Sequence, residues 1–255
     1  MRALWIADAH LSDPDSKPYR ALLELLERSP REIDTLVLLG DLFDVWLGDH
    51  PTLLAQHRTL LNVLTGIRTL GKDIFYLKGN HDFLLGKTIQ DEVGAHIPGD
   101  EAVFSWDGYR FVASHGDQIN KRDRGYQILR TLLRSPWTEK LLTFIGPSAS
   151  LWTARTLARV AGGTPDPRAV RVARAAHLQY ARTRLRGPVD AILLGHSHVV
   201  EWRVLTVRGK KKLYLNPGSW ADSQTYIQYL PGRFRLLKYR ENLSEVLFDF
   251  AFCLE

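Results

Sequence analysis

The side chains that could do chemistry are concentrated in five short motifs. They are DAH at 8–10, GDLFD at 40–44, GNHD at 79–82, SHGD at 114–117 and GHSH at 195–198. In DAH and GHSH the two polar side chains are two residues apart, so an extended backbone directs both to one face, where they can bind a metal ion. A single histidine of this kind is more often a hydrogen-bonded structural residue. Five such motifs along one chain indicate a metal centre.

Only oxygen and imidazole nitrogen atoms are available as ligands in these motifs. Such donors suit hard or borderline divalent ions, namely manganese, iron, cobalt, zinc or magnesium. Cys253 is the single cysteine, which excludes a thiolate zinc site and a disulfide framework, and we interpret it as a packed thiol. A carboxylate shared by two such ions would hold them roughly 3.5–4 Å apart.

The first half of the chain alternates between strand and helix patterns. Buried-strand patterns at 3–7, 35–39 and 74–77 enclose helical patterns at 19–29 and about 52–70. This alternation predicts a parallel sheet with crossover helices, and ligands of such sheets gather at the carboxyl ends of the strands. DAH, GDLFD and GNHD follow directly after these three strands. The sequence therefore places the chemistry at one edge of a sheet.

The second half has the pattern of antiparallel hairpins, after a further helix at about 88–93. Segments 103–106 and 109–114 are joined by Asp107 and Gly108, a strong hairpin signal. Segments 201–207 and 213–216 predict a second hairpin, and 226–230 and 234–239 predict a third.

Residues 118–187 interrupt these hairpins with helical stretches separated by prolines and glycines. The segment has 14 Lys and Arg against 3 Asp and Glu, a local net charge of +11 that leaves −5 for the rest of the chain. It also carries bulky apolar residues, including Trp137 and Trp152. Helices of this composition can bind acyl chains and anionic headgroups, whereas a helical lid that packs on itself is the alternative. We therefore divide the chain into core residues 1–117, an insertion at 118–187 and core residues 188–255.

The composition is typical of a globular protein. Hydrophobic residues make up 45% and charged residues 24% of the 255 residues. The sequence has no signal-peptide pattern and no run of roughly 18 apolar residues that could span a membrane. We expect a cytoplasmic protein, with the insertion bringing it to the inner membrane surface as a peripheral protein.

The ordered motifs resemble those of the calcineurin-like metallophosphoesterase superfamily, over essentially the whole chain outside the insertion. This resemblance implies an α/β fold, a four-layer αββα sandwich of two mixed sheets in which the helical insertion forms a lid. It also implies two divalent metal ions that share Asp41 as a bridging ligand. One ion would be bound by Asp8, His10, Asp41 and His198, and the other by Asp41, Asn80, His115 and His196.

In such a site, hydroxide formed from a bridging water attacks phosphorus while the metals neutralise charge on the phosphoryl oxygens. The catalytic residues would be Asp41, Asn80 and His81. His81 is placed to hydrogen-bond a phosphoryl oxygen or to protonate the leaving group, and its alternative role is structural support of Asn80. Asp44 and Asp82 would accept hydrogen bonds from ligating histidines, or Asp82 would cap the next helix.

Four histidines lie outside the strand-end motifs. We interpret His50, His57, His96 and His177 as structural or surface residues.

A finer resemblance is carried by GDLFDVWLGD, by HGDQINKRDRGYQILR, by FLLGK after GNHD and by the long basic insertion. These features are similar to the UDP-2,3-diacylglucosamine pyrophosphatase family of lipid A synthesis. The resemblance implies cleavage to UMP and 2,3-diacylglucosamine 1-phosphate by attack on the phosphorus nearer uridine, with manganese bound and an acyl pocket in the insertion. The substrate-binding residues it implies are Asn80, His81, Asp123, Tyr126, Arg168, Arg171 and Arg174.

The sequence departs from this family at one site residue. The best-known branch carries Arg where this chain has His81, so GNHD follows the wider superfamily, and YLNPGSW at 214–220 does the same. These departures leave the metal ligands in place but bear on the substrate.

The motifs are also compatible with three different functions. A phosphodiesterase or nuclease would use the basic insertion to bind nucleic acid, with a steep dependence on salt, although the apolar residues of the insertion favour a lipid. A phosphoprotein phosphatase gains no specific support from the basic insertion. The complete ligand set argues against a non-catalytic binding module that has kept the fold. We expect no obligatory protein partner.

Overall fold

The three strands that precede DAH, GDLFD and GNHD are parallel neighbours in one sheet. In this computed structural model, which describes residues 1–121, 124–133, 135, 137–138, 146–162, 167–241 and 243–252, β1 (Ala3–Ile6), β2 (Thr35–Leu38) and β4 (Asp73–Tyr76) are parallel neighbours. On the other side of β1, β11 (Thr225–Leu230), β12 (Arg233–Arg240) and β13 (Leu243–Ala251) complete a six-stranded mixed sheet in antiparallel pairing.

A second mixed sheet has five strands in the order β6-β7-β8-β10-β9. Its central strands β7 (Tyr109–Ser114), β8 (Ala191–Leu194) and β10 (Lys210–Pro217) are parallel, while β6 (Glu101–Trp106) and β9 (Val200–Val207) form antiparallel edges. A small parallel pair, β3 (Trp46–Leu47) and β5 (Asp82–Leu84), lies apart from both sheets.

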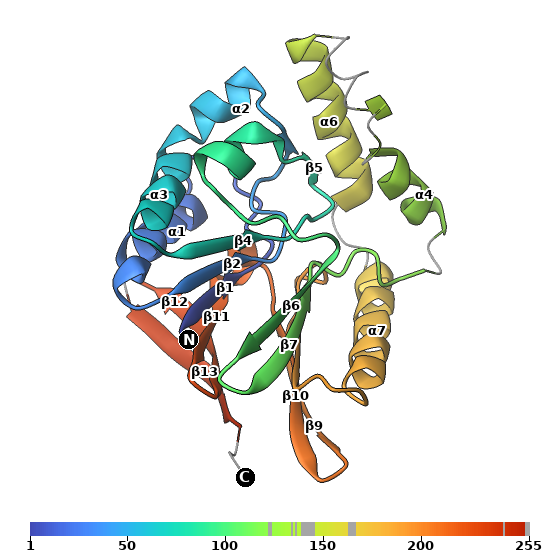
Figure 1. Ribbon diagram of the computed structural model, residues 1–255. Helices are drawn as coiled ribbons and strands as arrows, with labels where there is room; N and C mark the ends of the chain where they lie inside the picture. Colours follow the sequence, from blue (N-terminus) through green and yellow to red (C-terminus); the bar gives the residue numbers. More distant parts are fainter. Residues whose placement is uncertain are drawn as a thin grey trace.

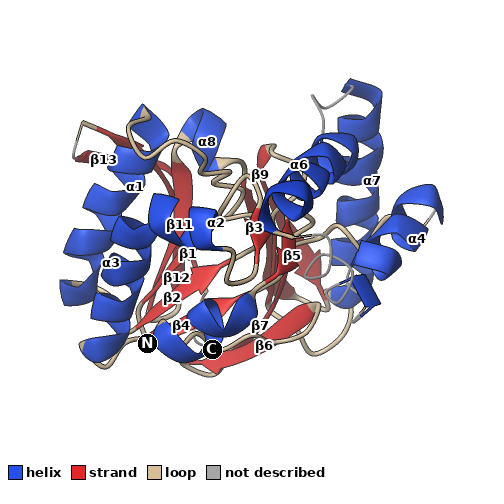
Figure 2. Ribbon diagram, turned by 90° about the horizontal axis from the view of Figure 1, so that it is seen from above, coloured by secondary structure: helices blue, strands red, loops and turns tan. Residues whose placement is uncertain are grey.

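The two large sheets pack face to face, with helices outside them. The inner core between the sheets includes Trp5, Val37, Phe111, Leu193 and Tyr229, which are buried completely. Figures 1 and 2 show the resulting layers, with α1 and α3 beside one sheet and α7 beside the other. The predicted α/β sandwich of two mixed sheets is confirmed.

Helices on the side of the six-stranded sheet are α1 (Lys17–Arg28), α2 (Pro51–Gln56) and α3 (Arg58–Thr69), with the short turns η1 (Ser29–Arg31) and η2 (Thr88–Glu92). The apolar faces of α1 and α3 bury Leu22, Leu26, Leu61 and Leu64 against the sheet. Burial of an amphipathic face supplies most of the stability of such helices.

Two expected helices differ from the structure. The single helix expected at 52–70 is divided at His57, whose backbone leaves helical geometry while its ring is buried against Tyr19 and Phe43. The helix expected at 88–93 is one wide turn of π type. At His57, tertiary packing of a side chain overrides a helical sequence pattern.

Described parts of the segment 118–187 form α4 (Arg124–Leu133), α6 (Pro147–Gly162) and α7 (Pro167–Arg184). α7 packs on the outer face of the five-stranded sheet, where Ala181 and Leu185 join Val112, Ile192 and Tyr214 in a separate buried cluster. The short helix α8 (Trp220–Ser223) follows β10. No helix in the described part of the chain has the length and apolar character needed to span a bilayer.

Candidate metal centre

Every expected ligand lies just beyond the carboxyl end of a parallel strand. Asp8 and His10 follow β1, Asp41 follows β2, and Asn80 follows β4 in the six-stranded sheet. His115 follows β7 in the five-stranded sheet, and the loop after β8 carries the last two ligands, His196 and His198. The site therefore forms where the same ends of both sheets meet.

Five of the seven expected ligands have left-handed backbone. Their φ angles are 49° for Asp8, 43° for His10, 51° for Asp41, 64° for His196 and 54° for His198. This conformation is unfavourable for a residue with a side chain, by about 1–3 kcal/mol each, and such residues collect at functional sites. Here it turns the chain sharply at the strand ends, so that the side chains converge.

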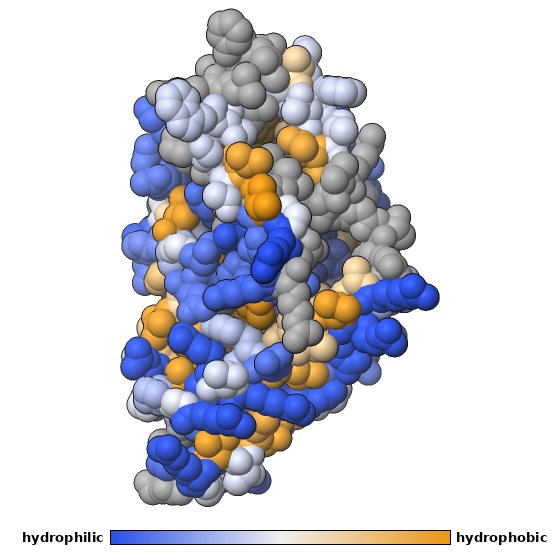
Figure 3. All heavy atoms as spheres, turned by 90° about the vertical axis from the view of Figure 1, so that its right-hand side faces the viewer, coloured by the Kyte–Doolittle hydropathy of each residue, from blue (hydrophilic) through white to orange (hydrophobic). Residues whose placement is uncertain are grey.

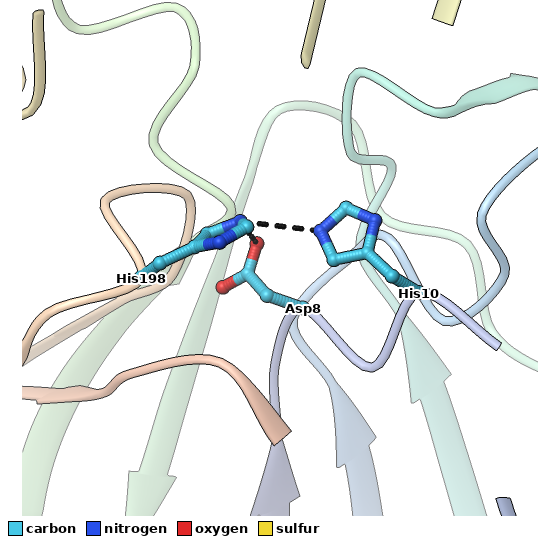
Figure 4. A group of neighbouring side chains, drawn as sticks. All are labelled: Asp8, His10 and His198. Atoms are coloured by element: carbon cyan, nitrogen blue, oxygen red, sulfur yellow. Dashed lines mark hydrogen bonds and ion pairs between the residues drawn. The ribbon is translucent and has the colours of Figure 1, made fainter. Parts of the chain in front are cut away.

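The first group of ligands is Asp8, His10 and His198 (Figure 4). His10 Nε2 lies 3.1 Å from His198 Nε2, and His198 Nε2 lies 3.6 Å from Asp8 Oδ1. Asp41 Oδ2 is 4.0 Å from His10 Nε2. Two imidazole nitrogens and two carboxylates thus face one point, which is the donor set that a borderline divalent cation prefers.

The second group is built around Asn80. Its Oδ1 atom lies 3.0 Å from His115 Nε2 and 2.9 Å from His196 Nδ1. Asp41 Oδ2 lies 3.4 Å from His115 Nε2. Because Asp41 lies near one histidine of each group, it occupies the position that a bridging carboxylate requires.

The loops that carry Asp41 and Asn80 contact each other so closely that glycine is required. A Cβ atom on Gly79 would lie 1.9 Å from Asp41 Oδ1, and one on Gly40 would lie 2.6 Å from His115 Nδ1. The left-handed φ of Gly40, 94°, also favours glycine.

Asp82 supports the same two loops. Its buried carboxylate accepts hydrogen bonds from the backbone N–H of Asp41 at 2.9 Å, from that of Gly79 at 2.8 Å and from the Tyr76 hydroxyl at 2.8 Å. Both expected roles of Asp82, as a partner of ligating histidines and as a helix cap, are therefore wrong. The three donors come from its own turn, from the loop after β2 and from β4, and all of them bind this one carboxylate.

Backbone carbonyl groups orient two imidazoles. His115 Nδ1 lies 2.8 Å from the carbonyl oxygen of Leu39, which leaves Nε2 to face the centre. His81 Nδ1 contacts the carbonyl oxygen of Asp44, and the His81 backbone N–H donates to Asp41 Oδ1 at 2.8 Å. His81 is buried, and its ring centroid lies 4.7 Å from that of His10.

The electrostatics of the centre suit a cation. Burial would raise the pKa of Asp41, but the neighbouring imidazoles of His115 and His81 hold it well below its usual range. Burial lowers the pKa of His10 and of His196 to about 3, so both are neutral and able to bind a metal. For His115, burial also lowers the pKa, but Asp41 and Asp8 raise it to about 10.

Among the expected substrate-binding residues outside the five motifs, Tyr126 lies beside the centre. Its hydroxyl donates to Asp117 at 2.9 Å, and its ring centroid is 6.3 Å from that of His196. Arg168 and Arg171 are exposed on α7. Asp123 lies outside the described residues.

Arg174 is held by a carboxylate of the core. It donates from Nε and Nη2 to the buried Glu201 of β9, at 2.8 Å each. A phosphate that binds Arg174 would have to compete with this pair.

Two further residues hold the loop of His115: Asp117, which has no role assigned from the sequence, and His177, which we interpret from the sequence as a structural or surface residue. The buried carboxylate of Asp117 accepts from Tyr126 and from Arg130 Nε at 2.7 Å, and so ties α4 to the loop of His115. His177 of α7 lies behind that loop, with Nε2 3.1 Å from the carbonyl oxygen of Gly116. The position of Asp117 within SHGD was a usable signal for the first, but nothing near His177 in the sequence indicates this contact.

Two mixed sheets between helices, with nitrogen and oxygen ligands at the meeting strand ends, are the features of a metal-dependent phosphoesterase. The chain belongs to the calcineurin-like phosphoesterase family, whose model matches residues 1–200. It is accordingly a metal-dependent hydrolase of phosphoester or pyrophosphate bonds.

Similar proteins carry a more specific name. A UDP-2,3-diacylglucosamine hydrolase of Psychromonas ingrahamii is 25% identical over 93% of this chain and 97% of its own. One of Bordetella parapertussis is 33% identical over 82% of each chain. A dimetal phosphatase from Danio rerio has the same fold, with 18% identity, a TM-score of 0.50 and 99% of each chain covered. The resemblance inferred from the sequence motifs is confirmed.

Proposed function

We propose that this chain hydrolyses the pyrophosphate bond of UDP-2,3-diacylglucosamine and releases UMP and 2,3-diacylglucosamine 1-phosphate. The observation that carries the proposal is the match, along 93% of the chain, to a hydrolase of that name. The arrangement of the seven ligands supports it, since it can bind two ions beside a phosphoryl group. The proposed substrate thus rests on the similarity to named hydrolases, and the proposed reaction rests on the arrangement of the ligands.

We assign two divalent ions to the seven ligands. Mn²⁺ is the ion that we propose, and Fe, Co, Zn and Mg are the alternatives. When bound, such ions activate a water at neutral pH and neutralise charge on the phosphoryl oxygens. Asp41 is placed to contact both ions, and Asn80 orients two of the histidines. His81 Nδ1 donates to the carbonyl oxygen of Asp44, so Nε2 is the atom left to face a substrate, and it donates to a phosphoryl oxygen or to the leaving group when both ring nitrogens carry protons.

A cavity of about 920 Å³ is lined by residues around β3 and β5 and by none of the seven ligands, and it is our candidate for part of the substrate site. Lys78, two residues before Asn80, and Lys87 contribute positive charge to its wall. Leu47 and Leu84 contribute apolar surface, and Ser150 closes it from α6. This mixture fits a molecule that carries both phosphates and acyl chains.

The remaining substrate contacts are proposals that follow from the family resemblance. We propose that Tyr126 and Asp123 contact the substrate near His196, and that Arg168 and Arg171 reach its phosphates from α7. Arg174 would offer Nε and Nη2 to a phosphate only after leaving Glu201, since both atoms donate there.

We further propose that the protein is cytoplasmic and binds the inner membrane through the insertion. Apolar side chains of α4 and its surroundings are exposed, by 77% for Trp137 and 62% for Ile128, and Trp152 of α6 is 71% exposed. On the face that carries these helices, apolar patches lie among hydrophilic side chains (Figure 3). Aromatic and cationic side chains together suit a membrane interface with anionic lipids.

The substrate assay tests the proposal directly. Metal-free protein supplied with Mn²⁺ and UDP-2,3-diacylglucosamine should release UMP, and the Asp41→Ala variant should release none. Absence of UMP, together with rapid cleavage of an oligonucleotide or a cyclic nucleotide, would contradict hydrolysis of the nucleotide-lipid and favour the phosphodiesterase alternative.

A further inference from the structure

The two ring nitrogens of His198 face different neighbours. Nε2 points to the centre, 3.1 Å from His10 Nε2 and 3.6 Å from Asp8 Oδ1. Nδ1 points away from it and lies 3.7 Å from Oδ2 of Asp222. Nε2 is thus the atom available to a metal, and the carboxylate of Asp222 lies on the opposite side of the ring. Figure 4 shows His198 with Asp8 and His10.

Asp222 is held in this position by the strand end that carries Asp8. The Ser219 hydroxyl accepts from the Asp222 backbone N–H at 3.3 Å and donates to the carbonyl oxygen of Asp8 at 3.0 Å. The backbone N–H of Trp220 donates to the carbonyl oxygen of Ala7 at 3.1 Å. Trp220 is completely buried, and its indole Nε1 donates to the carbonyl oxygen of Pro18 at 2.9 Å, so its side chain anchors α8.

Asn216, six residues before Asp222, holds the loop that carries His198. Asn216 is completely buried, and its Nδ2 donates to the carbonyl oxygen of Gly195 at 2.8 Å and to the Ser197 hydroxyl at 3.0 Å. Its Oδ1 accepts from the Gly218 backbone N–H at 2.8 Å. Residues 216–222 therefore connect the last metal-binding loop to the first.

We propose that Asp222 is a positioning residue for the metal centre, whose carboxylate accepts from His198 Nδ1–H and keeps Nε2 free for the metal. Carboxylate partners of this kind fix the tautomer and the ring orientation of ligating histidines. The present separation is an ion-pair distance, and a shift of under about 1 Å, or one intervening water, completes the hydrogen bond. The inference depends on metal binding by this family and not on the lipid substrate.

Metal binding by Asp222→Asn and Asp222→Ala tests this role. Metal-free protein is titrated with Mn²⁺ and followed by calorimetry and by the electron paramagnetic resonance of free Mn²⁺. Loss of such a partner typically weakens metal binding by about 10–100-fold. Because the Asp222 side chain is 73% exposed, we expect about tenfold at one of two sites, the other site unchanged and the melting temperature of metal-free protein unchanged.

Two further variants separate positioning from general effects. Asp222→Glu keeps a carboxylate and should recover most of the lost affinity. Asp15→Asn removes the same charge from an exposed position before α1 and should bind both ions as the unaltered chain does. Wild-type affinity in Asp222→Ala, equal weakening in Asp15→Asn, or equal weakening at both sites would overturn the proposal. None of these readouts uses the nucleotide-lipid, so failure of the UMP assay leaves them valid.

Discussion

At the scale of single residues, Asp41 is the side chain that contacts both groups of ligands. Its Oδ1 accepts from the His81 backbone N–H, while its Oδ2 lies 3.4 Å from His115 and 4.0 Å from His10. A side chain at position 79 would displace it. The same carboxylate therefore faces one histidine of each group and accepts a hydrogen bond from the GNHD turn.

His81→Gln should lower kcat by about 10²–10⁴, because glutamine keeps the shape of a hydrogen-bonding side chain but cannot transfer a proton. Metal content, measured by atomic spectroscopy, should remain two ions per chain. Turnover within twofold of the unaltered protein would contradict a catalytic role. Loss of metal together with turnover would favour the alternative in which His81 supports Asn80.

Metal binding should release about one proton per chain at pH 8. Metal-free His115 has a pKa of about 10 because Asp41 and Asp8 outweigh the effect of burial, so it is protonated at this pH. It must lose that proton before Nε2 can bind a metal. Calorimetric titrations in two buffers with different ionisation enthalpies measure the release, and a binding heat that is the same in both buffers would contradict it.

At the scale of elements, α7 serves as an outer layer of the sandwich. Besides its apolar contacts with the sheet, Arg174 pairs with Glu201 of β9, and Arg184 pairs with Glu101 of β6 at 3.0 Å. We therefore propose that the lid is formed by the part of segment 118–187 that precedes α7. α6 also contacts the core, through the buried residues Leu151 and Ala154.

The junction of α2 and α3 should make stability depend on pH. Burial lowers the pKa of His57 from 6.5 to about 4, and its Nδ1 lies 3.1 Å from the Tyr19 hydroxyl. The unfolded chain binds a proton near pH 6.5 that the folded chain takes up only near pH 4, so stability falls as pH decreases through this range. The loss is at most about 3 kcal/mol.

Urea unfolding between pH 7 and pH 4 measures this dependence. In His57→Gln, which is neutral throughout, the fall in unfolding free energy should be smaller by the contribution of this one group. An unchanged pH dependence would show that His57 titrates alike in both states.

The sequence predicted the parallel strands of the first half and the polar side chains at their ends, because both follow from local patterns. A buried run followed by Asp, His or Asn identifies a strand and its end, as at Asp8 and Asn80, and parallel strands bring their ends together. It did not predict the division at His57 or the assignment of α7 to the sheet. These depend on side chains that meet across long sequence separations, as do the contacts of Asp222.

At the scale of the whole molecule, charge is distributed unevenly. Residues 118–187 carry +11 and the rest of the chain −5. Such a distribution orients a protein toward an anionic surface, with an attraction that salt screens over about 8–10 Å.

The double variant Trp137→Ser and Trp152→Ser should bind vesicles of anionic phospholipid at least about tenfold more weakly, because two exposed aromatic side chains no longer enter the interface. Cosedimentation at low and high salt measures the change. Trp202→Ser is the matched control, since Trp202 stacks on Phe248 at 5.1 Å and should leave vesicle binding unaltered. Equal binding by the double variant would place the contact elsewhere.

The pairing of β1 has a consequence for how the protein is made. Its parallel neighbour β2 is synthesised soon after it, but its antiparallel neighbour β11 pairs Ile227 with Trp5, more than two hundred residues later. Contacts of such long sequence separation slow folding. While the chain emerges from the ribosome, Asp8 therefore lacks the support of Ser219 and Trp220 until most of the polypeptide has been translated, and the metal site is among the last features that the nascent chain completes.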